Sequence, residues 1–172
     1  MAEEEGVAGE QMVNGEDNLP QVAILSQYVK DLSFENPNAP AVYQWQEQPQ
    51  IAVDFNIGAF KLNDDLHEVS LKIDVRATAN GGQTAFAVEL VYAGLIGIRN
   101  VTEDQIQPFL LAEAPRLLFP FARQIISHAV QDGGFPPLML DPIDFNGVFL
   151  QRAGEQAAGE GAGGEAGEIG QA

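Results

Sequence analysis

Alternation of hydrophobic and polar side chains predicts four β-strands in the first half of the chain, the first of them over residues 22–35. From residue 28 onward this strand separates its apolar and polar positions onto two faces, with Tyr28, Leu32 and Phe34 on one and Asp31, Ser33 and Glu35 on the other. The strand is therefore expected to bury a row of rings and to present two carboxylates to solvent.

Three further strands are expected over residues 51–57, 66–78 and 84–92. The segment 66–78 alternates most strictly, so one of its faces should meet water. Between it and 84–92, the residues Asn80, Gly81 and Gly82 supply the positive φ angles that a tight hairpin needs.

The strand at 84–92 differs because it is apolar on both faces, with Glu89 as its lone charge. Two interpretations remain open: the strand is central in its sheet, or it contacts another subunit. On the second interpretation, the candidate interface residues share one face of the strand. They are Phe86, Val88, Leu90 and Tyr92.

The second half of the chain changes to helical periodicity. Thr102 and Gln105 have the spacing of a capping box and predict a short helix interrupted by a proline. A longer helix is expected over 115–132, and a last short helix over 144–152. Strands first and helices after predict an α+β fold, in which helices pack on one face of a four-stranded antiparallel sheet.

Composition narrows the class of protein. The 172 residues are 45% hydrophobic, contain no cysteine and carry a net charge of −17. Because no apolar run is long enough to span a membrane and no signal peptide is recognisable, we expect one cytoplasmic domain without direct membrane insertion. The acidic balance disfavours nucleic-acid binding, since phosphates would be repelled.

Charge and glycine content set the expected domain boundaries. Residues 1–18 are acidic and unpatterned, and residues 153–172 are rich in glycine and glutamate. Both segments are expected to be disordered tails because they cannot bury enough apolar surface to fold. Residues 19–152 are expected to form the folded domain.

The sequence contains none of the usual motifs of enzyme or cofactor sites. It has no phosphate-binding glycine loop and no nucleophile elbow, and His67 and His128 each stand alone. Asp31 and Glu35 should lie about 13 Å apart along one strand, too far for a glycosidase pair, whose carboxylates are roughly 5 to 10 Å apart. We therefore expect no catalysis, cofactor or metal. The two carboxylates form either an ordinary solvated face or a docking patch for a basic partner.

Aromatic and aliphatic side chains in two proline-flanked loops suggest an exposed groove. The alternative is that these loops fold back and cover the sheet. The groove candidates, including two from the neighbouring strand, are Tyr43, Trp45, Val53, Phe55, Phe135, Leu138, Met139 and Leu140.

The segment YVKDLSFENPNAP at residues 28–40 closely resembles the first strand and following turn of the SecB family of bacterial protein-export chaperones. The likeness covers essentially residues 21–152. It continues in order through Asp64-Asp65, Glu68-Val69, Thr84-Ala85-Phe86, Ala114-Pro115, Leu118-Phe119-Pro120, Ala122-Arg123, Phe135-Pro136 and 142–145.

This resemblance implies a homotetramer built as a dimer of dimers. It implies a cytosolic chaperone without ATPase activity, which holds unfolded precursors of exported proteins and passes them to the motor ATPase SecA. In the family, an acidic sheet surface receives the basic, zinc-containing C-terminal segment of that motor. The matching positions are Asp31, Glu35, Ala87 and Glu89, with Ala87 standing where the family has a larger aliphatic side chain.

The sequence thus leads to two hypotheses from different classes. The first is an export chaperone that binds nonnative chains in an apolar groove and docks a SecA-like motor through its acidic sheet face. The alternative is a small carrier that encloses an apolar ligand in a cavity between the sheet and the helices.

Overall fold

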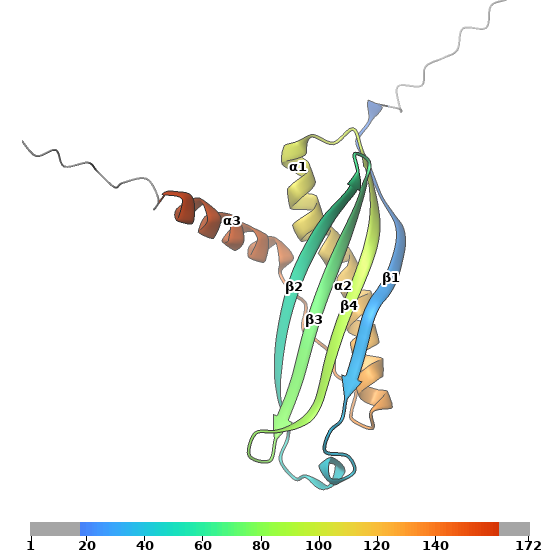
Figure 1. The fold of residues 1–172 in the computed structure, drawn as a ribbon, viewed down its shortest axis with the longest axis vertical. Coiled ribbons are helices and arrows are strands. Elements are labelled where there is room, and N and C mark those ends of the chain that lie inside the picture. Colours follow the sequence, from blue (N-terminus) through green and yellow to red (C-terminus); the bar gives the residue numbers. More distant parts are fainter. Residues whose placement is uncertain (1–17, 162–172) are drawn as a thin grey trace, which may run out of the picture.

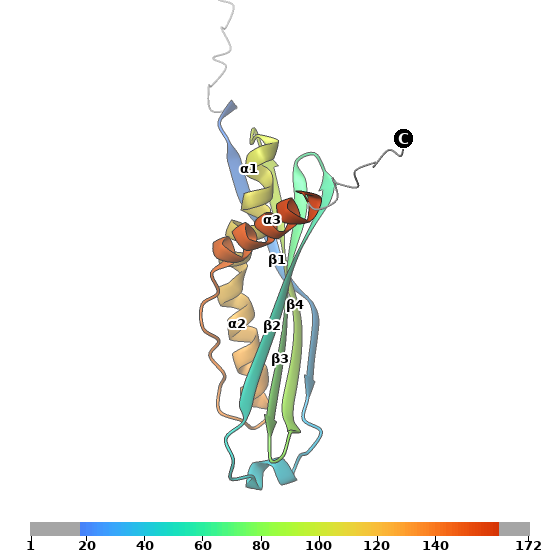
Figure 2. The same cartoon turned by 90° about the vertical axis from the view of Figure 1, so that its left-hand side faces the viewer.

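Four long strands form one antiparallel sheet in the order β1-β4-β3-β2, and helices cover one of its faces (Figures 1 and 2). The strands are β1 (Gln21–Glu35), β2 (Gln50–Asn63), β3 (Leu66–Ala79) and β4 (Gln83–Arg99). This computed structural model describes residues 18–161. The α+β class, the four antiparallel strands and the single helical layer are confirmed.

The connections follow from local chemistry. Asn80, Gly81 and Gly82 all have positive φ, as the hairpin between β3 and β4 requires. The longer connection from β1 to β2 contains the short 3₁₀ helix η2 (Ala41–Gln44). Strands β2 and β4 extend well beyond the predicted 51–57 and 84–92, because backbone pairing with β3 continues where the hydrophobic alternation fades.

The helical layer is one continuous run, where the sequence predicted two helices. It consists of α1 (Glu103–Pro108), the π-helical turn η3 (Phe109–Glu113) and α2 (Ala114–Asp132). The π-helical turn begins directly after Pro108, where an α-helical hydrogen bond cannot form. Thr102 is the N-cap residue, but its side chain makes no capping bond, so the predicted capping box is wrong.

The last helix, α3 (Phe145–Gly161), is longer than the predicted 144–152. The prediction of coil is therefore wrong for residues 153–161, where alanine and glutamate favour the helix and Gln151 contacts Glu155 one turn on. Residues 1–17 and 162–172 of the predicted tails lie outside the described residues.

The core lies between the sheet and α2. Leu71, Ile73 and Leu90 are fully buried beneath Leu118 and Ile126 of the helix. The predicted interface residues Phe86, Val88, Leu90 and Tyr92 belong to this core, at 0 to 7% exposure. Assigning them to a subunit interface was wrong, because β4 is a central strand and α2 already covers this face.

Strand β1 is interrupted by two register shifts, between Ile24 and Ser26 and between Val29 and Asp31. The second changes which side chains share a face, because an extra residue in one strand reverses the alternation. Tyr28 therefore lies on the open face, together with Asp31. Its predicted place beside Leu32 and Phe34 on the buried face was wrong.

Candidate functional site

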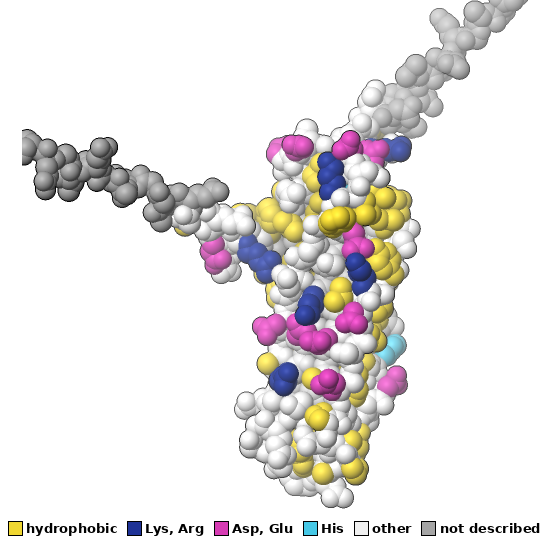
Figure 3. Space-filling view, viewed as in Figure 1, with side chains coloured by type: hydrophobic (Ala, Val, Ile, Leu, Met, Phe, Trp, Pro, Cys, Tyr) yellow, Lys and Arg dark blue, Asp and Glu magenta, His cyan; other side chains and the backbone are white. Residues whose placement is uncertain are grey.

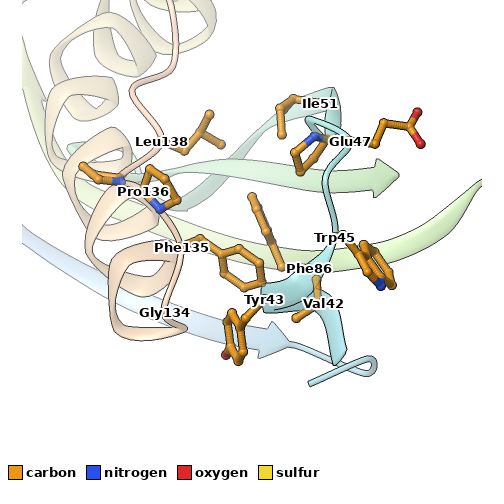
Figure 4. A pocket seen from close by; sticks show the side chains of 12 residues that line it. Val42, Tyr43, Trp45, Glu47, Ile51, Phe86, Gly134, Phe135, Pro136 and Leu138 are labelled. Atoms are coloured by element: carbon orange, nitrogen blue, oxygen red, sulfur yellow. The ribbon is translucent and has the colours of Figure 1, made fainter. Parts of the chain in front are cut away.

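An aromatic groove lies at the end of the sheet where η2 approaches the C-terminal end of α2. Its volume is about 470 Å³. Figure 4 shows the rings of Tyr43, Phe86 and Phe135 gathered near one another, with Trp45 further out on the loop. The groove is lined by Val42, Tyr43, Trp45, Glu47, Pro49, Ile51, Phe86, Gly134, Phe135, Pro136, Pro137 and Leu138.

Ring contacts and hydrogen bonds hold the groove walls together. Phe135 packs on Phe86 at 4.8 Å and on Tyr43 at 5.6 Å between ring centroids. The Tyr43 hydroxyl donates to the Gly133 carbonyl at 2.7 Å and accepts from the Asn36 amide at 2.7 Å. These bonds fasten the loop that follows β1 to the end of α2, so the groove is formed before any ligand enters.

The predicted groove residues divide into two groups. Tyr43, Trp45, Phe135 and Leu138 line the aromatic groove. The other four do not: Val53 is exposed on the edge strand, Phe55 packs edge-on against Phe145, Met139 points to solvent and Leu140 is buried. Neighbouring loop residues thus face opposite ways, and composition alone could not separate them.

Phe86 is the groove residue that sequence reasoning misassigned. It is 4% exposed, and its ring also packs on Phe34 at 6.2 Å between centroids. The prolines at 136 and 137 and Ile51 were missed as well. The sequence did offer a signal for them, because all three lie next to the loops whose aromatic side chains were predicted to form the groove.

The second site is the open face of the sheet, opposite the helices (Figure 2). In the ladder between β1 and β4, Asp31 pairs with Val91, Ser33 with Glu89, and Glu35 with Ala87. Paired residues point to the same side of a sheet, so the carboxylates of Asp31, Glu35 and Glu89 share this face. The structure thus brings together all four predicted docking positions.

Two further carboxylates on this face were missed. Asp54 pairs with Asp74, which pairs with Glu89, so three acids lie side by side on adjacent strands. We call the five acids with Ala87 the acidic surface: Asp31, Glu35, Asp54, Asp74, Ala87 and Glu89. Around Ala87 it is hollowed to about 480 Å³. Figure 3 shows acidic and basic side chains mixed over the middle of this face and hydrophobic ones toward its upper end.

A hydrogen-bonded cluster lies beside the acidic surface at the second bulge of β1. Tyr28 donates to one oxygen of Glu68 at 2.5 Å, and Lys30 pairs with the other at 2.7 Å. The hydrogen bond to Glu68, with burial second, raises the pKa of Tyr28 to about 12. The bonds from Lys30 and then Tyr28 lower the pKa of Glu68. The cluster therefore keeps Glu68 ionised and Tyr28 protonated at neutral pH.

The two histidines remain separate from both sites. His67 is buried on β3, where burial first and Lys61 second lower its pKa, and His128 is exposed on α2. Within residues 18–161, no three ligand-type side chains gather so as to hold a metal ion. No helix in the same part of the chain is long and apolar enough to cross a membrane.

The layer between sheet and helices, where an enclosed apolar ligand would sit, is filled by fully buried side chains such as Ile73, Leu118 and Ile126.

Comparisons with known proteins agree with this architecture. A family model described as preprotein translocase subunit SecB matches residues 15–156. The protein-export protein SecB of Rhizorhabdus wittichii is 60% identical over 92% of this chain and 94% of its own. That of Sphingopyxis alaskensis is 63% identical over 86% of this chain and 84% of its own.

One solved structure shares the fold at low sequence identity. It is a SecB-like chaperone of Mycobacterium tuberculosis in complex with a ChAD peptide from an antitoxin. The TM-score is 0.60 at 15% identity, and the match covers 71% of this chain and 90% of that one.

Proposed function

Because this chain belongs to the SecB family of protein-export proteins, we propose that it holds precursors of exported proteins unfolded in the cytoplasm and delivers them to a SecA-like motor ATPase. The aromatic groove is the observation that carries the proposal. Its rings, proline faces and aliphatic side chains offer contacts that fit many sequences, since none of them demands a particular hydrogen-bond partner.

Client binding in this scheme depends on several weak contacts along one chain. A groove of about 470 Å³ holds only a few side chains of an extended polypeptide. Repeating the groove in each subunit of a homotetramer, a dimer of dimers, would join such contacts on one client and raise its avidity. Exposed apolar side chains on the edge strand β1 support assembly with further copies: Val22, Leu25, Val29 and Leu32.

Docking of the motor is assigned to the acidic surface. Its partner is the basic, zinc-containing C-terminal segment of the motor, and the zinc would belong to that segment. The carboxylates of Asp31, Glu35 and Glu89 are exposed and lie on adjacent strands, which supports recognition of clustered positive charge. Release of the client would follow from motor binding without ATP hydrolysis by the chaperone.

Two pairs of variants test the scheme. Glu89→Lys should weaken binding of the motor while leaving capture of a reduced, unfolded client intact. The matched control Asp64→Lys makes the same charge change at the distant β2–β3 turn, where that side chain is 96% exposed. It should leave both motor binding and client capture unchanged. Equal loss of both activities in Glu89→Lys, or loss of neither, would reject the assigned docking surface.

The second pair concerns the groove. Leu138→Asp places a charge in the aromatic groove and should weaken client capture, whereas Met139→Asp changes the adjacent exposed side chain and should not. Titration of an unfolded client, followed by light scattering of the soluble complex, measures both variants and reports the subunit number. Equal client affinity in the two variants would argue against the groove as the binding site.

A further inference from the structure

A single arginine lies within the acidic surface. Arg76 on β3 pairs across the ladders with Ala52 on one side and Ala87 on the other, and Ala87 pairs with Glu35. The neighbouring row of residues is Asp54, Asp74, Glu89 and Ser33. Arg76 and these acids line the same hollow of about 480 Å³.

Cross-strand geometry places Arg76 close to several carboxylates. Directly paired residues have Cβ atoms about 5 Å apart and diagonal neighbours about 7 Å. Asp54 and Glu89 are diagonal neighbours of Arg76, on opposite sides of it. The long side chain of an arginine spans such distances, so its positive charge acts on the whole hollow.

Within the described residues, the guanidinium of Arg76 does not form an ion pair with any one acid. Lys30 pairs with Glu68 at 2.7 Å, and Lys72 lies 3.7 Å from Asp74. Among residues 18–161, by contrast, Arg76 has no carboxylate within 4.0 Å. It is exposed to solvent, and the small Ala52 and Ala87 on either side leave its guanidinium open to an incoming partner.

We propose that Arg76 is a specificity-determining residue that limits the affinity of the acidic surface for a lysine- and arginine-rich segment. This inference rests on the proposed docking of a basic partner. A partner's cation that enters the hollow gains from Asp54, Asp74 and Glu89 but is repelled by Arg76. The arginine therefore keeps docking weak enough to reverse after each delivery, and it makes the spacing of the partner's positive charges matter.

Substitution of Arg76 should tighten binding. Two unit charges about 7 Å apart in water interact by roughly one RT, which corresponds to about a three-fold change in affinity. Arg76→Ala should thus bind an oligolysine peptide about three-fold more tightly at low ionic strength, and Arg76→Glu, a change of two charges, about ten-fold more tightly. Both gains should shrink as added salt screens the surface.

Arg99→Ala is the matched control. It removes the same charge from the far end of β4, about 40 Å away at ~3.3 Å per residue, where Arg99 lies 3.6 Å from Asp65. The full-length chain is titrated with oligolysine by calorimetry, and thermal unfolding shows that each variant is folded. The proposal predicts tighter binding for both Arg76 variants and unchanged binding for Arg99→Ala.

The outcomes separate this inference from the docking proposal. If the wild type binds and Glu89→Lys weakens binding, but Arg76→Ala binds equally or less tightly, the role of Arg76 is overturned and the docking surface stands. An equal gain in Arg99→Ala would assign the effect to net charge and also overturn it. If neither the wild type nor Arg76→Ala binds oligolysine at low salt, both proposals fail together.

Discussion

The hydroxyl of Tyr28 should stabilise the bulged part of β1, and Tyr28→Phe tests this by removing that group alone. The hydrogen bond to Glu68 raises the pKa of Tyr28 from 10.0 to about 12. A shift of that size corresponds to about 2.7 kcal/mol between the two protonation states. Because solvent reaches the cluster and screens it, we expect the variant to lower the free energy of unfolding by about 1 kcal/mol.

The sign of the pH dependence follows from the direction of the shift. A group whose pKa is higher in the folded protein contributes stability that is complete below its unfolded pKa of 10.0 and is lost as the pH rises through about 12. Denaturant unfolding at fixed chain concentration measures the loss at neutral pH. Titration of phenolate absorbance should show the latest tyrosine step disappearing in Tyr28→Phe.

A double-mutant cycle with Glu68→Gln supplies the control. Once the carboxylate is removed, Tyr28→Phe should cost clearly less than in the wild type, since the charge-assisted bond is already gone. An equal cost in both backgrounds, or a tyrosine titration step at about pH 12 that persists in Tyr28→Phe, would refute the description of this cluster.

Three further outcomes are expected. Phe86→Ala should destabilise the chain by about 3 to 5 kcal/mol in denaturant unfolding, and Phe86→Leu by less than about 1.5, because the ring is buried in the core as well as in the groove. Tyr43→Phe should cost about 1 kcal/mol by the same measurement, since it breaks the hydrogen bonds with Asn36 and Gly133. The lowered pKa of His67 makes its contribution complete above pH 6.5 and weaker as the pH falls below it, so His67→Leu should flatten the pH dependence of unfolding in that range.

Strand β3 shows what hydrophobic alternation can predict. Its inward residues Val69, Leu71 and Ile73 are all fully buried while the residues between them face the open side. A central strand with one covered face must alternate, so the sequence located it to within one residue. The edge strand β2 lacks this constraint, because its outer backbone is unpaired and its side chains are mostly exposed.

Predicting the acidic surface requires the register in which β2 and β3 pair, and hydrophobic alternation alone does not set that register. An unshifted two-residue turn at 64–65 would pair Asp54 with Val75 and direct a carboxylate toward the helices. The observed shift between Lys61 and Asn63 pairs Asp54 with Asp74 instead. The hydrophobic pattern and the turn length together demand this bulge, so Asp54 and Asp74 could have been found from the sequence by requiring both to hold.

The aromatic groove could be predicted only in part because its residues come from three separate stretches of chain. Loop composition identified Tyr43 and Phe135, but it did not show that the end of β4 lies beneath them. Phe86 looked like an ordinary inward strand residue, which it also is. When one residue belongs to both the core and a surface site, the sequence pattern shows only its place in the core.

The placement of Phe86 and Ala87 connects the two sites physically. They are consecutive residues of β4, so their side chains point to opposite faces, Phe86 into the aromatic groove and Ala87 into the hollow of the acidic surface. A partner that shifts this end of β4 must therefore move a wall of the groove as well. Since Phe86 packs tightly between Phe34 and Phe135, even a small displacement disturbs the ring contacts that form this wall of the groove. In the proposed function, a partner docked at Ala87 and a client bound at Phe86 would therefore be coupled through the single strand β4.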